Sequence, residues 1–493
     1  MQRVPRCWSK PACADIDDFG FGADAGNSKG SNPMIRIFNH YIHGRTLSQI
    51  MLDFGLITGI VIMAVGWREP SLPAAASQCL PWAVLLGACA LLINFALGFY
   101  ERVHNRSVGQ SRARAVLSLF LILPLSYVAL HFLPMALEHL EFAALGIAAG
   151  LVGMLSHRVH AGHSHAQSNG RQRVLVFGSG AQAKVVGRAL QKSDPRIELV
   201  GYYASPNEAV DQSASWGGVA SRASLTEVVE QQRVDEIVVA LAERRGGSMP
   251  LRELLDCKLK GIRVVDMATH FEQTLGQIRL DSVSAGWLVF GDGFNQGFLR
   301  TIVKRAFDIV CATGLIVLAS PVIVVTAVVV MLERNGPILY RQQRVGLHGR
   351  LFHVVKFRSM RADAEKDGTP RWAAAKDNRV TRVGRVIRKL RIDELPQLFS
   401  VLTGHMSLVG PRPERPYFVD TLTKDLPYFA ARHSVKPGVT GWAQVRYHYG
   451  ASVEDAAQKL QYDLYYVKNH TLFLDIVILF ETVGVVLLAK GAV

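Results

Sequence analysis

The sequence predicts a membrane protein in three parts. These are a membrane α-helical bundle of four N-terminal spans, an α/β domain with a parallel sheet, and a mostly α-helical monotopic domain held by a re-entrant membrane helix. Three observations predict this fold class. Four apolar stretches lie within the first 156 of 493 residues, strand and helix patterns then alternate, and a fifth apolar run has basic residues on both sides.

The composition excludes several other classes of protein. Hydrophobic residues make up 49% of the chain, and the formal net charge is +15. This combination excludes a disordered chain, a collagen and a small disulfide-stapled domain. The six cysteines are scattered without a Cys-x-x-Cys pair, which argues against a disulfide framework or a zinc site. A basic chain of this kind is expected to meet an anionic lipid, a nucleic acid or a phosphorylated substrate.

Two segments that flank the predicted bundle are expected to lack regular structure. Residues 1–46 are predicted to be disordered, and the first 33 contain no apolar core of a cleavable signal peptide. Residues 157–172 form a His-rich linker. Its histidines are His157, His160, His163 and His165. Imidazole binds metals, but the irregular spacing and the lack of acidic or Cys neighbours favour a polar linker.

The bundle is predicted over residues 47–156. Its apolar stretches are Ile50–Trp67, Leu80–Phe99, Ala115–Leu133 and Phe142–Leu155. Each approaches the roughly 20 residues that are needed to cross a bilayer. Arginines lie before the first stretch, in the second loop and after the fourth, so the positive-inside rule places both ends of the bundle in the cytoplasm. Asp53, near the start of the first span, is expected to pair with another helix or to lie at the interface.

From Arg173 the pattern changes to alternating strands and helices, which predicts an α/β domain over residues 173–298. The expected strands cover residues 173–177, 198–203, 236–241 and 263–267. The first is followed by Gly178-Ser-Gly180-Ala-Gln-Ala183 and a helical stretch, as in the dinucleotide-binding turn of Rossmann-like domains. The acidic residue that would hold a ribose is missing, and no Tyr-x-x-x-Lys pair occurs. A non-catalytic module is favoured over a nucleotide-binding regulatory module and over a redox site.

The fifth apolar run, Ile309–Leu332, is predicted to belong to a re-entrant helix over residues 303–333. It is long enough to span a membrane, yet both of its flanks are basic and are expected on the cytoplasmic side. Ser320-Pro321 lies near its middle, where proline removes a hydrogen bond and breaks or kinks the helix. We expect the helix to enter and leave on one face, with the Ser320 hydroxyl helping to satisfy a freed carbonyl. A kinked true span is the alternative.

The C-terminal domain is predicted to extend over residues 299–493. Its last apolar run, Leu472–Leu488, contains Asp475 and Glu481, and a sixth span would bury both carboxylates. We therefore expect this run to form an amphipathic helix on the membrane surface.

A strongly basic segment follows the predicted re-entrant helix. Residues 341–391 contain 15 Lys and Arg against four acidic residues, a local net charge of +11. Such a segment suits anionic lipid, a solvated surface or a site for several phosphates, and no recognised nucleic-acid-binding motif accompanies it.

The acid pair Asp393-Glu394 comes directly after this basic segment. Neighbouring cations are expected to lower the pKa of both carboxyls and to keep both ionised. An ionised Asp can attack phosphorus, and a second carboxylate can help to hold Mg²⁺. The alternative is a pair of acids that are merely favoured at a helix N-terminus.

A series of ordered motifs runs from Lys304 to Asp475. They are Lys304-Arg-Ala-Phe-Asp308, Gly336-Pro337, Arg341-Gln-Gln-Arg-Val-Gly346, Lys356-Phe-Arg-Ser-Met360, Asp393-Glu-Leu-Pro-Gln397, Met406-Ser-Leu-Val-Gly-Pro-Arg-Pro413, Arg432-His433, Lys436-Pro-Gly-Val-Thr-Gly-Trp-Ala-Gln444 and Tyr462-Asp-Leu-Tyr-Tyr466. This region resembles the bacterial sugar transferases, also called polyprenyl-phosphate hexose-1-phosphate transferases. The whole chain is similar to their large, multi-domain exopolysaccharide branch. Leu390-Arg391 departs from the Thr-Ser that the family often has there, and Ser400 from a frequent Asn.

The resemblance implies a reaction. Sugar-1-phosphate would pass from a UDP-sugar to undecaprenyl phosphate, giving undecaprenyl-diphospho-sugar and UMP, as the initiating step of exopolysaccharide or capsule biosynthesis. Asp393 would be the catalytic nucleophile that forms a covalent aspartyl-phosphosugar intermediate and contacts Mg²⁺, with Glu394 as its catalytic partner. The residues implied to bind substrate phosphates are Lys356, Arg358, Arg388 and Arg412. The break in the family's re-entrant helix is matched by Ser320 and Pro321.

The expected partners are undecaprenyl phosphate, a UDP-sugar and membrane lipid, without nucleic acid, and a homodimer is left open. The expected location is the bacterial inner membrane, as a multi-pass protein with the catalytic domain on the cytoplasmic face. Glucose is weakly preferred over galactose and N-acetylated sugars. Two other functions stay open: a membrane-anchored NAD-dependent sugar-nucleotide dehydratase or epimerase, and a non-enzymatic scaffold for polysaccharide assembly.

Overall fold

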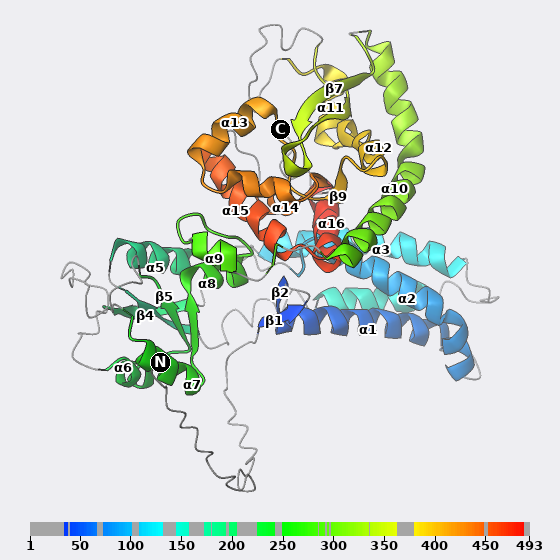
Figure 1. The fold of residues 1–493 in the computed structure, drawn as a ribbon. Helices are drawn as coiled ribbons and strands as arrows, with labels where there is room; N and C mark the ends of the chain where they lie inside the picture. Colours follow the sequence, from blue (N-terminus) through cyan, green and yellow to red (C-terminus); the bar gives the residue numbers. More distant parts are fainter. Residues whose placement is uncertain are drawn as a thin grey trace, which may run out of the picture.

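The fold is given by a computed structural model of the chain. It describes residues 34–37, 40–66, 72–100, 108–131, 144–156, 172–178, 180–193, 197–204, 224–241, 249–283, 285–290, 293–294, 297–334, 336–361, 379–447 and 452–487. The four histidines of the predicted linker and the first 33 residues lie outside these ranges. Figure 1 shows helices α1 to α3 stacked side by side, the α/β domain next to them, and the C-terminal domain above both.

A short hairpin corrects the prediction that residues 1–46 are disordered. Strands β1 (Met34–Ile37) and β2 (His40–His43) pair in antiparallel fashion, and helix α1 begins at Gly44. The hairpin sequence is rich in Ile and includes Tyr41, residue types that favour strands. A prediction of disorder for the whole segment does not take this local preference into account.

Three apolar helices form the main part of the N-terminal bundle. They are α1 (Gly44–Gly66), α2 (Leu72–Ala96) and α3 (Val108–His131). Each contains a window that is long and apolar enough to cross a membrane. The fourth predicted span is the shorter apolar helix Ala144–Ser156, and the remaining long candidate among the described residues is α10, in the C-terminal domain.

Polar side chains inside the bundle pair with one another. The Tyr100 hydroxyl donates to Asp53 Oδ2 over 2.7 Å, and the Ser118 hydroxyl donates to Asn94 Oδ1 over 2.6 Å. Asp53 is buried, so this bond satisfies a carboxylate that would otherwise be costly in an apolar environment. Asp53 is thus paired, as expected, although its partner Tyr100 lies in the turn just after α2 and not on a helix.

The α/β domain contains the predicted parallel sheet. Its strands are β3 (Gln172–Phe177), β4 (Ile197–Tyr203), β5 (Glu236–Val239) and β6 (Arg263–Asp266), in the spatial order β4-β3-β5-β6. All three neighbouring pairs are parallel. Its helices are α5 (Ala181–Ser193), α6 (Leu225–Gln231), α7 (Leu251–Leu259) and α8 (Met267–Leu275). Alternate residues of β3 enter two separate apolar clusters, because successive side chains point to opposite faces of a sheet.

The strand order differs from that of a Rossmann fold. Counted from the first strand it is 2-1-3-4, as in flavodoxin-like sheets, whereas the Rossmann order begins 3-2-1-4. The Gly-rich turn predicts a strand, a turn and a helix, but it does not determine which strands become neighbours. Gly178 in this turn has φ +128°, and a Cβ would lie 2.8 Å from the Ala240 carbonyl oxygen. Glycine is therefore required here by the close approach of the chain after β5.

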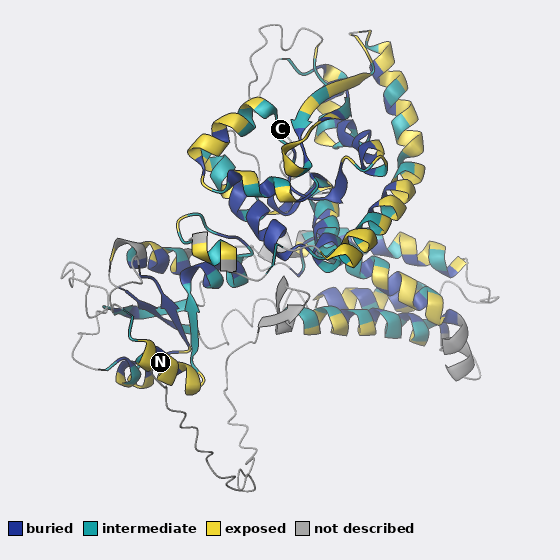
Figure 2. Ribbon diagram, viewed as in Figure 1, coloured by how far each residue is buried: buried dark blue, intermediate teal, exposed yellow. Residues whose placement is uncertain are grey.

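The C-terminal domain surrounds one large apolar core. Its elements are α9 (Ala285–Phe290), α10 (Phe298–Leu332), β7 (Leu339–Val345), η1 (Leu347–Gly349), β8 (Leu351–Phe357), α11 (Arg382–Lys389), η2 (Ile392–Glu394), α12 (Gln397–Leu402), β9 (Ser407–Val409), α13 (Pro416–Asp425), η3 (Phe429–Ser434), β10 (Gly438–Thr440), α14 (Trp442–Arg446), α15 (Val453–Asn469) and α16 (Leu472–Leu487). Buried residues gather in α12, α14 and α15, which Figure 2 shows in dark blue. β7 and β8 pair in antiparallel fashion, while β9 and β10 are parallel.

Buried contacts join the α/β domain to this core. Glu272 of α8 receives hydrogen bonds from Lys468 Nζ (2.8 Å) and Asn469 Nδ2 (2.7 Å), and all three residues are buried. Trp442 Nε1 donates to the Gly276 carbonyl over 2.7 Å. Ile278 is fully buried in the C-terminal core, so the chain enters that core directly after α8.

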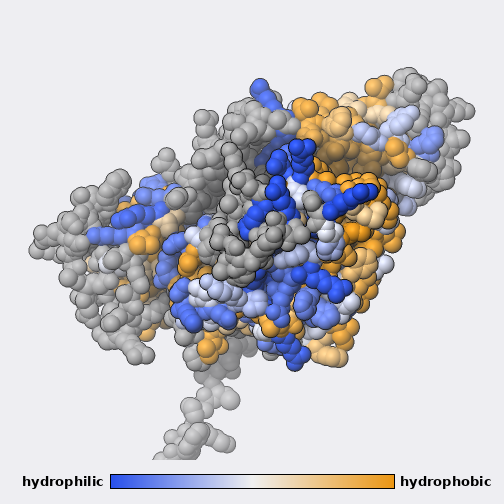
Figure 3. Space-filling view, turned by 90° about the horizontal axis from the view of Figure 1, so that it is seen from above, coloured by the Kyte–Doolittle hydropathy of each residue, from blue (hydrophilic) through white to orange (hydrophobic). Residues whose placement is uncertain are grey.

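Helix α10 is continuous through Ser320-Pro321, and Figure 1 shows it as a long curved helix. The predicted break is thus a bend. Pro321 cannot donate to the Val317 carbonyl, and the Ser320 hydroxyl donates to that carbonyl instead, over 2.8 Å. The predicted role of the Ser320 hydroxyl is confirmed. Much of the helix is exposed and apolar, and Figure 3 shows apolar surface (orange) along the side where α10 lies.

Both ends of α10 contact the same domain. Near its start, Arg305 Nη2 donates to the Leu402 carbonyl over 2.7 Å. At its end, Arg358 Nη2 donates to the Val330 carbonyl over 2.8 Å. The C-terminal domain therefore lies along one side of this helix.

The final helix, α16, corrects the prediction of an amphipathic surface helix. Leu474 and Ile478 belong to the main core, and the other side of the helix packs on α2, where Phe480 contacts Phe95. Its acids are buried and paired. Asp475 binds Lys304 over 2.9 Å and the Tyr466 hydroxyl over 2.7 Å, and Glu481 pairs with Arg446.

Candidate active site

The acid pair Asp393-Glu394 lies on a short 3₁₀ turn, η2, between α11 and α12. Both residues are buried, each with 8% of its surface exposed. Arg391 precedes the turn with φ 57°, in the left-handed region, and this reverses the chain after α11. Ile392 packs into a small apolar cluster with Val330 at the end of α10. The pair is thus fixed between α10 and the main core.

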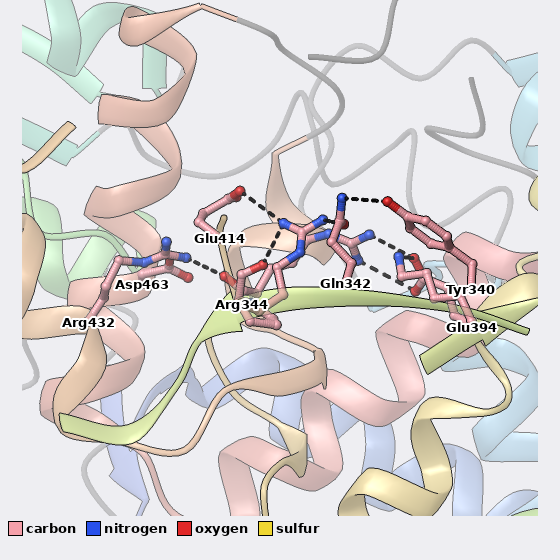
Figure 4. A network of polar contacts seen from close by, with 10 residues as sticks. Tyr340, Gln342, Arg344, Glu394, Glu414, Arg432 and Asp463 are labelled. Atoms are coloured by element: carbon pink, nitrogen blue, oxygen red, sulfur yellow. Dashed lines mark hydrogen bonds and ion pairs between the residues drawn. The ribbon is translucent and has the colours of Figure 1, made fainter. Parts of the chain in front are cut away.

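Glu394 is surrounded by cations from three directions. Arg412 Nη2, just beyond β9, donates to Glu394 Oε1 over 2.7 Å, and Lys356 Nζ of β8 donates to the same oxygen over 3.2 Å. Arg391 Nη1 lies 3.8 Å from it. Figure 4 shows Glu394 at one end of a row of polar contacts above strand β7. The predicted residues Lys356 and Arg412 are therefore brought to the acid pair.

The two carboxyls differ in pKa. Burial would raise the pKa of Glu394, but Arg412 and Lys356 outweigh burial and hold that pKa well below its usual range. Burial, together with the charge of Glu394, raises the pKa of Asp393 to about 6, against the opposing charges of Lys356, Arg388 and Arg412. The prediction that cations lower both pKa values is correct for Glu394 and wrong for Asp393, because Glu394 takes the close ion pairs.

The other two predicted phosphate-binding arginines lie in different surroundings. Arg388, on α11, is partly buried and close enough for its charge to act on Asp393. Arg358 is buried, with Nη1 donating to the Pro337 carbonyl and Nη2 to the Val330 carbonyl, both over 2.8 Å. The bond to Val330 caps the end of α10, and the bond to Pro337 holds the loop that follows this helix. The structure does not bring the terminal nitrogens of Arg358 to the acid pair, so the phosphate contact expected of it is not supported.

Two ion pairs, one of them buried, support the loop that carries Arg412. Arg432 Nη2 donates to the Arg412 carbonyl (2.8 Å) and to Asp463 Oδ2 (2.7 Å). Arg344 Nη1 donates to the Pro413 carbonyl (3.1 Å) and pairs with Glu414. Figure 4 shows these labelled side chains in one row along β7.

Sequence reasoning included Arg432 and Asp463 in family motifs but gave them no role. The sequence did contain a signal for this pair, because charged residues among apolar neighbours require a partner when they are buried. Arg432 and His433 also line a small hollow next to Arg412. Burial and the charge of Arg432 lower the pKa of His433 to about 4, so its ring is neutral at pH 7.

The carboxylates of the acid pair offer few ligands for Mg²⁺. No group of three His, Cys, Asp or Glu side chains suited to a metal occurs among the described residues. Glu394 is engaged by Arg412 and Lys356, whereas the carboxylate of Asp393 has no ion pair within the part of the chain that the structure describes. Mg²⁺ usually keeps several waters and uses one or two carboxylates plus substrate phosphates. The residues present therefore fit a Mg²⁺ ion that arrives with a substrate phosphate and takes one carboxylate ligand from the protein.

Known proteins share this region. The model of the family "Bacterial sugar transferase" matches residues 299–489, which contain η2 and all three cations around Glu394. A UDP-glucose:undecaprenyl-phosphate glucose-1-phosphate transferase of Escherichia coli K12 is 31% identical over 332 residues, covering 66% of this chain and 70% of that protein. This chain belongs to the bacterial sugar transferase family.

Other members of the bacterial sugar transferase family differ in the sugar in their names. A UDP-N-acetylgalactosamine-undecaprenyl-phosphate N-acetylgalactosaminephosphotransferase of Aeromonas hydrophila is 41% identical over 260 residues, 53% of this chain and 60% of that protein. The match to a Xanthomonas campestris UDP-glucose:undecaprenyl-phosphate glucose-1-phosphate transferase is 30% identical over 367 residues, 71% of this chain and 75% of the relative. The chain thus spans well under the full length of these relatives. Their names do not agree on one sugar.

Proposed function

We propose that this bacterial sugar transferase moves sugar-1-phosphate from a UDP-sugar to undecaprenyl phosphate. The products are undecaprenyl-diphospho-sugar and UMP, and the reaction initiates the synthesis of an exopolysaccharide or capsule. The observation that carries the proposal is the arrangement of the acid pair. Glu394 is held by Lys356 and Arg412, while the Asp393 carboxylate next to it has no ion pair among the described residues. The names of the relatives support both substrates.

The proposed chemistry has two displacement steps. In the first, a carboxylate oxygen of Asp393 attacks the β-phosphorus of the UDP-sugar, and the bond from this phosphorus to the bridging oxygen breaks. UMP leaves with that electron pair, and the sugar phosphate is bound to Asp393 as an acyl phosphate. In the second, an oxygen of undecaprenyl phosphate attacks the same phosphorus. The bond to Asp393 breaks, and the carboxylate is regenerated.

The residues around Asp393 suit this chemistry. A pKa of about 6 leaves most of the Asp393 carboxyl ionised at pH 7, as an attacking oxygen requires. Lys356, Arg388 and Arg412 surround the same point with positive charge, which stabilises the charge of a transferring phosphoryl group. Asp393 would hold Mg²⁺ together with substrate phosphate oxygens, and the ion would neutralise further phosphate charge when bound.

The proposed location is the inner membrane, with the catalytic domain on the cytoplasmic face. A helix of 35 residues is about 52 Å long, whereas the hydrocarbon core of a bilayer is about 30 Å thick. A single polar domain contacts α10 near Arg305 and again at Val330. A perpendicular span would place part of that domain inside the bilayer. These contacts support a re-entrant α10, whose exposed apolar side faces lipid.

The test is release of UMP by the purified full chain with undecaprenyl phosphate, Mg²⁺ and a panel of UDP-sugars. We expect Asp393→Asn to abolish release while the protein still inserts and folds. Asp420→Asn is the matched control, because Asp420 lies exposed on α13 and its loss removes the same charge. Turnover at the wild-type rate in Asp393→Asn would disprove the nucleophile. Transfer of labelled sugar phosphate onto wild-type protein, absent from the variant, tests the covalent intermediate directly.

A further inference from the structure

Gln397, the first residue of α12, carries a buried side-chain nitrogen without a hydrogen-bond partner. Only 3% of the residue is exposed, and its Nε2 atom meets no acceptor in the part of the chain that the structure describes. Such a donor loses its hydration on burial and gains no bond in return, so unpartnered buried donors are rare in native proteins. A catalytic role is one of the few explanations for one that lies beside a candidate active site.

The acid pair lies one helical turn before Gln397. The chain is helical from η2 into α12, because Leu395 N–H donates to the Ile392 carbonyl and Leu398 N–H donates to the Leu395 carbonyl. Side chains three or four residues apart on a helix are neighbours. Leu398 and Val401, which are close to Gln397 on α12, belong to the apolar core and have no acceptor atoms in their side chains.

The two carboxylates of the acid pair differ in what they can accept from Gln397. Glu394 already receives hydrogen bonds from Lys356 and Arg412. The carboxylate of Asp393 has no ion pair among the described residues and is therefore the acceptor that is left. No hydrogen bond joins the described side chains of Asp393 and Gln397 in this structure. The carboxyl group must turn about its single bonds to meet the amide.

We propose that Gln397 is a positioning residue whose amide donates to the oxygen of Asp393 that does not bond to phosphorus. This inference rests on the proposed function. Lys356 and Arg412 hold Glu394, and Gln397 holds the nucleophile itself.

The bond from Gln397 serves both displacement steps. One oxygen of Asp393 bonds to the β-phosphorus as UMP leaves, and the amide holds the other oxygen and so fixes the direction of attack. When the bond from phosphorus to Asp393 later breaks, its electron pair returns to the carboxylate, whose charge the amide N–H stabilises. The amide keeps both of its protons throughout. A carboxylate oxygen accepts at two positions, so this bond leaves a position for Mg²⁺.

The test compares kcat and KM for UMP release, and the melting temperature, of the full chain in lipid nanodiscs. Gln397→Met keeps the length of the side chain and removes the amide. We expect kcat to fall roughly 10- to 100-fold, as for the loss of one hydrogen bond to a charged group. KM for the UDP-sugar should stay at the wild-type value, because the amide touches Asp393 and not the substrate. The melting temperature should stay equal or rise, because an apolar group replaces an unpartnered buried polar group.

Two further variants complete the comparison. Gln397→Asn keeps the amide on a shorter side chain, so its kcat should fall between those of the wild type and Gln397→Met. Gln191→Met makes the same substitution at an exposed position on α5 of the α/β domain. It should leave both kcat and the melting temperature unchanged.

The opposite effects on kcat and on stability separate positioning from a purely structural role. If kcat falls only together with the melting temperature, the role is structural and the inference is wrong. If KM for the UDP-sugar rises at unchanged kcat, Gln397 contacts the substrate, and the inference is wrong again. An active wild type with an equally active Gln397→Met overturns this inference alone. A wild type that releases no UMP with any UDP-sugar overturns the proposed function as well.

Discussion

The buried ion pair between Arg432 and Asp463 gives a quantitative test of how the site is supported. Only 6% of the Arg432 side chain and 3% of the Asp463 side chain are exposed, and Oδ2 accepts from Nη2 at 2.7 Å and from Nε at 3.1 Å. Burial raises the pKa of Asp463 against the opposing effect of Arg432. Asp463→Asn leaves the Arg432 charge buried without its counter-charge, which costs about 3–5 kcal/mol.

This loss of folding free energy can be converted into a change in melting temperature. In a domain of about 200 residues, each kcal/mol lowers the melting temperature by about 2–4 °C. The lower bound of the cost therefore corresponds to roughly 6–12 °C, measured by scanning fluorimetry of the detergent-solubilised protein. Asp281→Asn is the control, since the Asp281 side chain in its pair with Arg279 is 50% exposed and such pairs contribute at most about 1 kcal/mol. A drop of less than about 2 °C for Asp463→Asn would refute the reasoning.

A double variant distinguishes stability from the positioning of Arg412. Arg432→Met with Asp463→Leu removes both charges, and such replacements are often neutral for stability. It also removes the hydrogen bond from Arg432 to the Arg412 carbonyl. We expect its melting temperature to recover toward the wild-type value while UMP release stays low. Recovery of both would mean that Arg432 has no part in placing Arg412.

Two further predictions concern pH and membrane topology. Burial and the charges of Arg300 and Lys304 lower the pKa of His470 to about 4. As the pH falls, His470 therefore takes up its proton in the unfolded chain before it does so in the folded protein. The stability that is present above pH 6.5 is lost toward pH 4, by about 2 kcal/mol at pH 5. His470→Asn should make the melting temperature less dependent on pH between pH 7 and pH 5, and an unchanged dependence would contradict this. In the re-entrant arrangement, a cysteine in the exposed variant Arg350→Cys is labelled by an impermeant maleimide only after the cells are permeabilised. Labelling in intact spheroplasts would instead favour a true span.

The fold could be predicted where it depends on local pattern and not where distant segments meet. The spans and the parallel sheet follow from apolar runs and alternating periodicity, which are properties of neighbouring residues. Helix α16 was misplaced because Asp475 and Glu481 resemble the polar face of a surface helix. Their partners, Lys304 and Arg446, come from other elements of the chain, and only the packed structure brings them together.

In the candidate site, too, features that depend on local sequence could be predicted, and features that depend on contacts between distant segments could not. The acid pair could be found from sequence, because two acids directly after a basic segment are unusual and match a family motif. The division of labour between Asp393 and Glu394 could not be predicted, since it depends on where Arg412 and Lys356 end in space. The charge of Arg358 suggests a phosphate contact, yet its nitrogens satisfy one carbonyl at the end of α10 and one in the loop that follows. An Arg can meet either need, and sequence alone does not distinguish them.

Glu394 resolves a difficulty that the proposed site for two phosphates must meet. Several cations held close together in a buried place repel one another when no substrate is bound. In this structure Glu394 supplies the missing negative charge, and its low pKa means that it does so across the physiological range. Asp393 remains outside these ion pairs and so keeps its carboxylate available. In the proposed reaction, an incoming phosphate would then compete with Glu394 for cations that are already in position, so that binding requires little reorganisation of the site.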